Sequence, residues 1–315
     1  MLVYFETSAI NRFAKNRTVA DAIATKELQR NKRRRWVVSI VSLWEIFLTT
    51  QEDERAPLID FSRFLFDENL ISSPEELVVN FVDAGCPLHE RKYPLVSRGV
   101  MVREWMKACR NKEYLFHPSK HDLEFRTYVW RMYGKFIDGI IRKSTIVESK
   151  EDPKGLTEVF MNEIYESLDW VKQNKGIDRK TERVIRISIF YSMIILCWGI
   201  LFDQMTVERF WKRKGIDQPR DRAHFLARNH PEVFYRGPMA GMARLTYEQC
   251  KSKYTRGMLF DALHSIYIDY VHLFVTADEH FRELRNRGYD PNHSKICHMD
   301  ELQWTEHIRD VSDKY

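Results

Sequence analysis

Both ends of the chain carry short apolar runs that meet an acidic residue and then a helix-forming segment. The first run, Leu2–Phe5, is followed by Glu6, and a second run covers Trp36–Ile40. Near the other end, His272–Thr276 leads to Asp278. A short apolar run bounded by polar residues is typical of a buried strand, and strands that alternate with helices form a parallel sheet. This order predicts an α/β core built by the two ends together.

The residues that follow the first two runs are expected to start helices. Thr7 and Ser8 can supply the capping hydroxyl of a helix that begins at about Ala9. Ser42 is expected to cap a second helix, with Glu45 in its first turn. At the C-terminal end, apolar residues recur at helical spacing over 256–270, a further helix is expected over 279–287, and a last short strand over 295–298.

The middle of the chain, 51–255, differs from both ends because it reads as mostly helical. Glycine and proline are scarce, with 12 and 10 residues in a chain of 315, which favours long helices over many short strands. Three long stretches lack proline: Leu123–Arg142, Leu156–Lys175 and Arg179–Phe210. We therefore expect a core formed by 1–50 and 256–315, with a large α-helical insertion over 51–255.

One segment of the insertion, Ile187–Phe202, is a run of 16 residues without a charge. A membrane-spanning helix needs about 20 apolar residues, so we expect a central helix of a helical core and no membrane partner. The alternative is a transmembrane or membrane-surface helix. The five cysteines form no C-x-x-C pair and the N-terminus has no basic signal region, which together favour a cytoplasmic protein.

Four acidic residues occupy comparable places in the α/β parts of the sequence. Glu6 and Asp278 follow strands, Glu45 follows the second strand, and Asp261 lies on the helix before the strand at 272–276. Functional groups of parallel sheets gather at the carboxyl ends of the strands. Four converging acids would repel one another, and a hard divalent cation, Mg²⁺ or Mn²⁺, would offset that repulsion. The ordinary alternative is that the acids stabilise helix N-termini, or that Asp261 faces solvent.

Four motifs in this order resemble those of the PIN-domain nucleases. They are a strand that ends in an acid and Thr/Ser, a Glu on the helix after the next strand, a D-A-x-x-S helix, and a strand that closes on T-x-D. In this chain they are Tyr4–Ser8, Ser42–Ile46, Phe260–Ser265 and Phe274–Asp278. The resemblance covers 1–50 and 256–315, and it implies a PIN-like parallel sheet interrupted by the insertion.

The resemblance implies a metal-dependent endoribonuclease that hydrolyses RNA phosphodiester bonds. Glu6, Glu45, Asp261 and Asp278 would then be the catalytic acids and the ligands of Mg²⁺ or Mn²⁺. Thr7, Ser8 and Thr276 would contact the ligands or a phosphate. Such nucleases are often toxins or defence effectors, which implies a neutralising partner protein. The insertion is expected to recognise the substrate, an inhibitor or a second copy of the chain, as in a homo-oligomer.

Two features depart from the family pattern. The first acid is usually Asp, whereas this chain has Glu6, and most small family members lack a long insertion. An added methylene moves the carboxylate by about 1.5 Å, which matters where catalytic placement is exacting. The alternative reading is therefore a catalytically impaired PIN-like module that binds RNA or protein.

Two basic stretches with interleaved aromatic residues are candidate RNA contacts, 31–36 and 208–230. Their cations would hold phosphates and their rings would stack on unpaired bases, against the alternative of solvated helix faces. The cations that we single out are Arg33, Arg34, Arg35, Lys212 and Arg213, and the rings are Trp36, Phe210 and Trp211. The net charge of +5 permits a polyanionic partner without requiring one.

Overall fold

A computed structural model of the chain divides it into two compact units. Unit 1 comprises Met1–Ser73, Pro94–Arg126 and Tyr267–Tyr315, and unit 2 comprises Pro74–Tyr93 and Thr127–Ile266. The structure describes residues 2–15, 35–66, 69–84, 100–124, 126–128, 131, 205–230, 232–235, 237–249, 257–287 and 291–300. The predicted RNA contacts Arg33 and Arg34, and the apolar run at 187–202, lie outside these residues.

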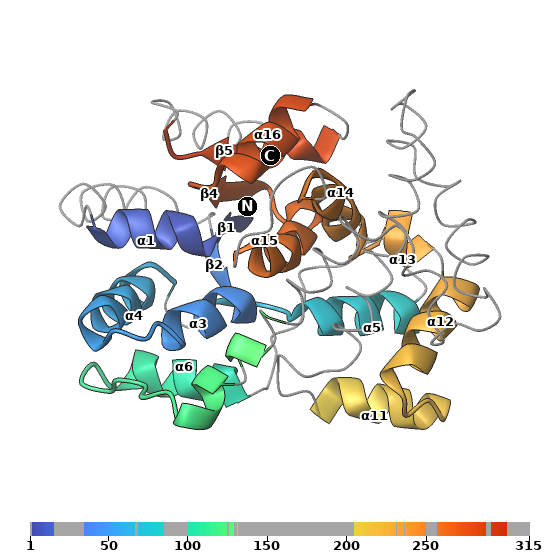
Figure 1. Ribbon diagram of the computed structural model, residues 1–315, viewed down its shortest axis with the longest axis horizontal. Coiled ribbons are helices and arrows are strands. Elements are labelled where there is room, and N and C mark those ends of the chain that lie inside the picture. The colour runs from blue at the N-terminus through green and yellow to red at the C-terminus, as the bar shows by residue number, and fades with distance from the viewer. Residues whose placement is uncertain are drawn as a thin grey trace. The chain divides into compact units, whose positions relative to one another are not determined.

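Unit 1 contains a sheet of five parallel strands in the order β3-β2-β1-β4-β5 (Figure 1). The strands are β1 (Leu2–Phe5), β2 (Arg35–Ser39), β3 (Leu70–Ile71), β4 (Leu273–Thr276) and β5 (Ile296–His298). The central strand β1 pairs Tyr4 with Val37 on one side and with Phe274 on the other. The predicted α/β class with a parallel sheet is therefore confirmed.

The strand order changes direction between β1 and β4. From β1 the chain proceeds through β2 to β3 on one side, and β4 and β5 extend the sheet on the other. Such a switch point opens a crevice at the carboxyl ends of the strands, where open α/β sheets bind ligands. Glu6 directly follows β1, and Thr276 is the last residue of β4.

The helices of unit 1 flank this sheet and bury an aromatic core. They are α1 (Thr7–Lys15), α3 (Ile40–Phe47), α4 (Glu52–Phe66), α6 (Val100–Arg110) and α16 (Glu279–Arg287), with 3₁₀ turns at Ile266–Asp269 and Pro291–Lys295. Phe5 lies at the centre, 4.9 Å from the ring of Trp36 and 5.6 Å from that of Phe66. Each such buried side chain contributes about 1.5–3 kcal/mol to stability, so these contacts fix the position of β1.

Unit 2 consists of helices among its described residues. They are α5 (Pro74–Ala84), α11 (Met205–Lys214), α12 (Pro219–Asn229), α13 (Glu232–Tyr235), α14 (Ala240–Gln249) and α15 (Met258–Ser265). Arg222 on α12 makes a bidentate ion pair with Glu208 on α11, at 2.8 and 2.9 Å. None of the helices in the described ranges of either unit combines the length and the hydropathy needed to cross a membrane.

The structure corrects three local predictions. The second strand ends at Ser39, whose hydroxyl accepts a hydrogen bond from Ser42 N at 3.1 Å, so Ser39 and not Ser42 caps α3. Glu45 consequently lies in the second turn of α3 instead of the first. The helix expected over 256–270 ends at residue 265, before a 3₁₀ turn. In addition, β3 lies inside the span 51–255 that we expected to be mostly helical.

Candidate functional site

Glu6 begins the candidate site at the carboxyl end of β1. Its backbone N–H donates to the carbonyl of Val275 at 2.9 Å and so extends the sheet by one residue. Its carbonyl accepts from Ala9 N at 3.0 Å, and its Oε1 atom accepts from Ser8 N at 2.9 Å. These bonds are those of a helix-capping residue, so Glu6 caps α1 as well as closing the strand. The side chain is 3% exposed.

Thr276 and Ser8 hold the other carboxylate oxygen of Glu6 across the switch point. Oε2 of Glu6 accepts from Thr276 Oγ1 at 3.0 Å and from the hydroxyl of Ser8. Ser8 Oγ in turn accepts from Ala277 N at 2.9 Å. The ends of β1 and β4 are thus joined by hydroxyl groups that the sequence analysis placed beside the acids.

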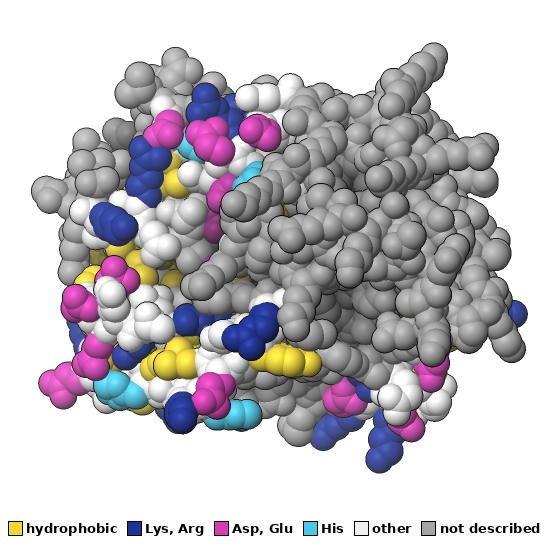
Figure 2. Space-filling model, viewed as in Figure 1, with side chains coloured by type: hydrophobic (Ala, Val, Ile, Leu, Met, Phe, Trp, Pro, Cys, Tyr) yellow, Lys and Arg dark blue, Asp and Glu magenta, His cyan; other side chains and the backbone are white. Residues whose placement is uncertain are grey.

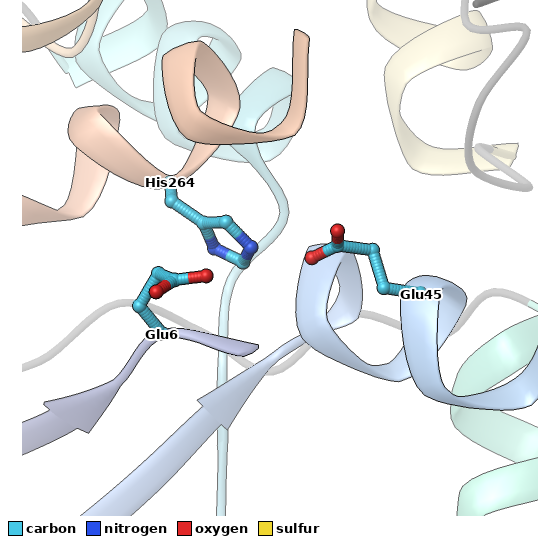
Figure 3. Close-up of side chains that lie close together, drawn as sticks. All are labelled: Glu6, Glu45 and His264. Atoms are coloured by element: carbon cyan, nitrogen blue, oxygen red, sulfur yellow. The ribbon is translucent and has the colours of Figure 1, made fainter. Parts of the chain in front are cut away.

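Glu45 reaches the same edge of the sheet from α3, the helix that follows β2. Its Oε2 atom accepts a hydrogen bond of 2.5 Å from Thr7 Oγ1. Glu6 and Glu45 offer carboxylate oxygens within 4.8 Å of one another. Figure 3 shows Glu6 after the end of β1 and Glu45 on α3. Two like charges at this separation cost free energy that a bound cation offsets. Carboxylate oxygens are the ligands that Mg²⁺ and Mn²⁺ prefer.

Tyr4 lies in the core behind the two acids. Its hydroxyl is 2.8 Å from Ser39 Oγ and 3.2 Å from Ser42 Oγ. Burial raises the pKa of Tyr4 well above its usual value, and the charges of Glu6 and Glu45 raise it further against the two serine hydrogen bonds. Tyr4 therefore stays neutral and adds no third negative charge at this position.

Asp278 caps α16, the helix that follows β4. Its Oδ1 atom accepts from His280 N at 2.8 Å and lies 3.1 Å from His280 Nδ1. Burial by itself raises the pKa of Asp278, but the hydrogen bonds and charge of His280 outweigh it and lower the pKa below its ordinary value. The same contact raises the pKa of His280. Thr276 links Asp278 to Glu6, because Thr276 Oγ1 also accepts from Asp278 N at 3.0 Å.

The fourth predicted acid, Asp261, belongs to unit 2, in the first turn of α15. It is 7% exposed, so the alternative that it faces solvent is wrong. His264 follows one turn later on α15 and is fully buried. The described structure thus brings together Glu6 and Glu45 in unit 1 and joins Asp278 to them through Thr276. The role of Asp261 as a ligand stays a sequence prediction.

The predicted RNA contacts have mixed outcomes. Arg35 is exposed at the start of β2 and donates from Nε to Asn69 Oδ1 at 2.8 Å, and Lys212 and Arg213 are exposed on α11. Three predicted base-stacking rings are buried instead, namely Trp36 (4% exposed), Phe210 (1%) and Trp211 (2%). The prediction that these rings stack on bases is wrong, because all three are buried.

The sequence analysis did not single out His298, the last residue of β5. It is fully buried, its Nδ1 atom accepts from Asp300 N at 3.2 Å, and Glu279 and Asp300 lie near it. Arg12 pairs with Asp300, and Arg282 pairs with Glu279 at 2.9 Å. Two arginines thus balance the two acids, and this group lacks the excess negative charge that Glu6 and Glu45 present. The sequence feature that could have pointed to His298 is its position, because it ends a predicted strand, as Glu6 follows one, at the same edge of the sheet.

Comparisons with known protein families, with curated proteins and with solved structures give no match to this chain.

Proposed function

We propose that the chain is a metal-dependent endoribonuclease, with Glu6 and Glu45 as ligands of Mg²⁺ or Mn²⁺. The observation that carries the proposal is the approach of these two carboxylates within 4.8 Å beside the switch point of a parallel sheet. The donor set fits the ion, because both groups offer hard oxygen atoms. A bound ion would supply Lewis acidity and a more acidic water for phosphodiester hydrolysis.

The residues around the pair support this role by fixing the acids in place. Thr7 orients Glu45 through a hydrogen bond of 2.5 Å, and Thr276 orients Glu6 through one of 3.0 Å. Side chains held in this way need little reorganisation when charge develops at a substrate. Asp278, whose pKa is lowered by His280, is ionised at neutral pH and is proposed as a further acid of the site.

A second candidate function is a PIN-like module that binds RNA or protein without cleaving it. One observation favours it: both oxygens of Glu6 already accept hydrogen bonds, from Ser8 N and from Thr276 Oγ1. A carboxylate whose oxygens accept the hydrogen bonds of a helix cap is less available as a metal ligand. The two candidates differ in whether Mn²⁺ binds at the acids.

The test measures Mn²⁺ binding by electron paramagnetic resonance and cleavage of labelled single-stranded and structured RNAs. Wild type is compared with Glu45→Gln, Asp278→Asn and Glu6→Asp, and Glu54→Gln on the exposed start of α4 is the matched control. The nuclease proposal expects Mn²⁺-dependent cleavage that Glu45→Gln abolishes and Glu54→Gln leaves unchanged. If wild type neither binds Mn²⁺ nor cleaves RNA while Glu6→Asp does both, the chain is a nuclease that Glu6 has made catalytically inactive.

A further inference from the structure

His298, the last residue of β5, has a ring nitrogen that no hydrogen bond satisfies within the described part of the chain. The side chain is 1% exposed, and its Nε2 atom is buried without a hydrogen-bond partner among the described residues. The other nitrogen, Nδ1, accepts from Asp300 N at 3.2 Å. A polar nitrogen buried without a partner costs free energy, which a bound ligand would recover.

Two carboxylates lie around this ring. Glu279 is the first residue of α16, and Asp300 lies in the turn after β5. Each offers an oxygen, and His298 a ring nitrogen, that all lie within 4.8 Å of one another. Both carboxylates are exposed, and Figure 2 shows acidic side chains beside Lys or Arg side chains near the top, where Figure 1 places β5 and α16. An ion can therefore reach the buried ring from the side of the carboxylates.

The separation of His298 and Glu279 matches a shared metal ion better than a hydrogen bond. Glu279 Oε1 lies 3.8 Å from His298 Nε2, which is too long for a hydrogen bond. Nitrogen and oxygen ligands bind Zn²⁺ at about 2.0–2.2 Å, so two ligands of one tetrahedral ion are about 3.4 Å apart. Because the Glu279 side chain is exposed, a small rotation closes the difference.

The imidazole decides which ion this group would take. Mg²⁺ prefers oxygen ligands, whereas Zn²⁺ binds imidazole nitrogen together with carboxylate oxygen. One His and two carboxylates make three protein ligands, which leave the fourth position of a tetrahedral ion for water. The hydrogen bond and charge of Arg12 lower the pKa of Asp300 below its ordinary value, so this carboxylate is ionised at neutral pH, as a metal ligand must be.

Arg12 and Arg282 are the cations with which an ion would compete. Arg12 pairs with Asp300, and Arg282 pairs with Glu279 at 2.9 Å. Both arginine side chains are 42% exposed, and ion pairs that are open to solvent contribute little to stability. An incoming divalent cation can therefore displace both guanidinium groups into solvent, whereas the buried ring of His298 has no such access to water.

We propose that Glu279, His298 and Asp300 form a Zn²⁺ site, with His298 bound through Nε2. Binding at Nε2 requires the imidazole proton on Nδ1, where Asp300 Oδ2 lies 3.6 Å away and can accept it. The second oxygen of Asp300 remains for the ion. His298 is the register partner of Thr276, so the ion would join α16 to β5 one strand away from β1 and Glu6.

The experiment measures Zn²⁺ binding to the full chain by isothermal titration calorimetry in excess Mg²⁺, which occupies sites made of oxygen alone. Glu279→Gln and Asp300→Asn each remove an exposed ligand, and His298→Gln removes the buried one. Glu283→Gln is the matched control, because Glu283 is exposed on α16 one turn after Glu279.

Wild type is expected to bind Zn²⁺, and Glu279→Gln or Asp300→Asn to weaken binding at least about 10-fold, since even the outer partners of metal ligands contribute about 10–100-fold. Glu283→Gln is expected to equal wild type. Arg12→Gln and Arg282→Gln should tighten binding about two- to fivefold, because each removes a competing cation.

Three calorimetric results would overturn the proposal. They are the absence of Zn²⁺ binding in wild type, equal affinities in wild type and the two carboxylate variants, and loss of Zn²⁺ binding in Glu45→Gln. The first two would leave the buried nitrogen to an ordered water. The third would place the ion at the Glu6–Glu45 pair instead.

Proton NMR of the Co²⁺-loaded chain shows whether His298 itself binds the ion. Co²⁺ shifts the Nδ1–H resonance of a bound imidazole far from its usual range, and this resonance disappears in deuterated water. We expect one such resonance in wild type and in Glu283→Gln, and none in His298→Gln. Its absence from wild type would show that His298 is no ligand. Because Glu279→Gln and Asp300→Asn alter exposed side chains, they test the site even if His298→Gln fails to fold.

Discussion

The hydroxyl of Thr276 donates to the carboxylate of Glu6 at 3.0 Å, and the two residues lie 270 positions apart in the chain. This bond joins the two segments that the sequence separates by most of its length. Because Thr276 Oγ1 also accepts from Asp278 N, one hydroxyl fixes an acid after β1 and an acid after β4. The geometry of the candidate site therefore depends on a side chain that carries no charge.

Replacing Thr276 by Val tests this dependence, because Val has the same shape without the hydroxyl. Thr276 is fully buried, so the loss leaves a buried carboxylate oxygen of Glu6 and the N–H of Asp278 with weaker partners. We expect the free energy of unfolding to fall by about 1–3 kcal/mol in urea denaturation. Thr49→Val, which removes a half-buried hydroxyl that donates to the carbonyl of Glu45, is the control, with an expected loss below about 1 kcal/mol. Equal losses in both would contradict a special role for Thr276.

Glu45→Gln should separate charge repulsion from metal binding. In the absence of metal the variant removes one of two like charges within 4.8 Å, so we expect it to be at least as stable as wild type. Mn²⁺ at 100 times its dissociation constant should stabilise wild type by about 2.7 kcal/mol and leave the variant unchanged. Thermal unfolding with and without Mn²⁺ measures both effects. Equal stabilisation of wild type and variant would place the ion elsewhere.

The parallel sheet was predictable because its signal is local. Leu2–Phe5 and Leu273–Thr276 are apolar runs bounded by acids and hydroxyls, and both became strands within one residue of their predicted bounds. The strand Leu70–Ile71 was missed because two residues carry no periodicity, and it exists through pairing with Val38 and Ser39. Whether Leu70–Ile71 forms a strand depends on its pairing with β2, and the sequence alone does not show that pairing.

The candidate site was predictable in its residues but not in its contacts. Glu6, Glu45 and Asp278 follow strands, and strand order brings such residues to one edge of the sheet. Their partners depend on side-chain rotamers, so the hydrogen bond from Thr7 to Glu45 could not be read from spacing. Trp36 and Trp211 show a second limit of the sequence. Their basic neighbours suggested that the rings are exposed, whereas both rings are buried in the core.

Tyr114 gives a pH-dependent prediction in unit 1. Its hydroxyl donates to the carboxylate of Glu104, and burial, then the hydrogen bond and charge of Glu104, raise the pKa of Tyr114 from 10.0 to about 12. A raised pKa means that the protonated form is favoured in the folded state. The stability contributed by Tyr114 is therefore fully present below pH 10.0 and is lost as the pH rises through about 12.

The phenolate absorbance difference between wild type and Tyr114→Phe isolates this group among the 14 tyrosines. We expect the difference to titrate near pH 12, and in a Glu104→Gln background to titrate at a lower pH because the negative charge is gone. A difference curve centred near pH 10.0 in wild type would show that the two side chains do not interact.

Gly241→Ala should destabilise unit 2 through the packing of α14 on α15. A Cβ atom at residue 241 would lie 2.1 Å from the carbonyl oxygen of Ser265, and backbone atoms cannot yield as a flexible side chain does. We expect a loss of about 1–3 kcal/mol or more in the free energy of unfolding, the range for overpacked interiors. Gly257→Ala is the matched control, because a Cβ there meets its nearest heavy atom, a carboxylate oxygen of Asp261, at an ordinary 3.8 Å. Calorimetry that finds the two variants equally stable would contradict the close approach of α14 to the carbonyl of Ser265.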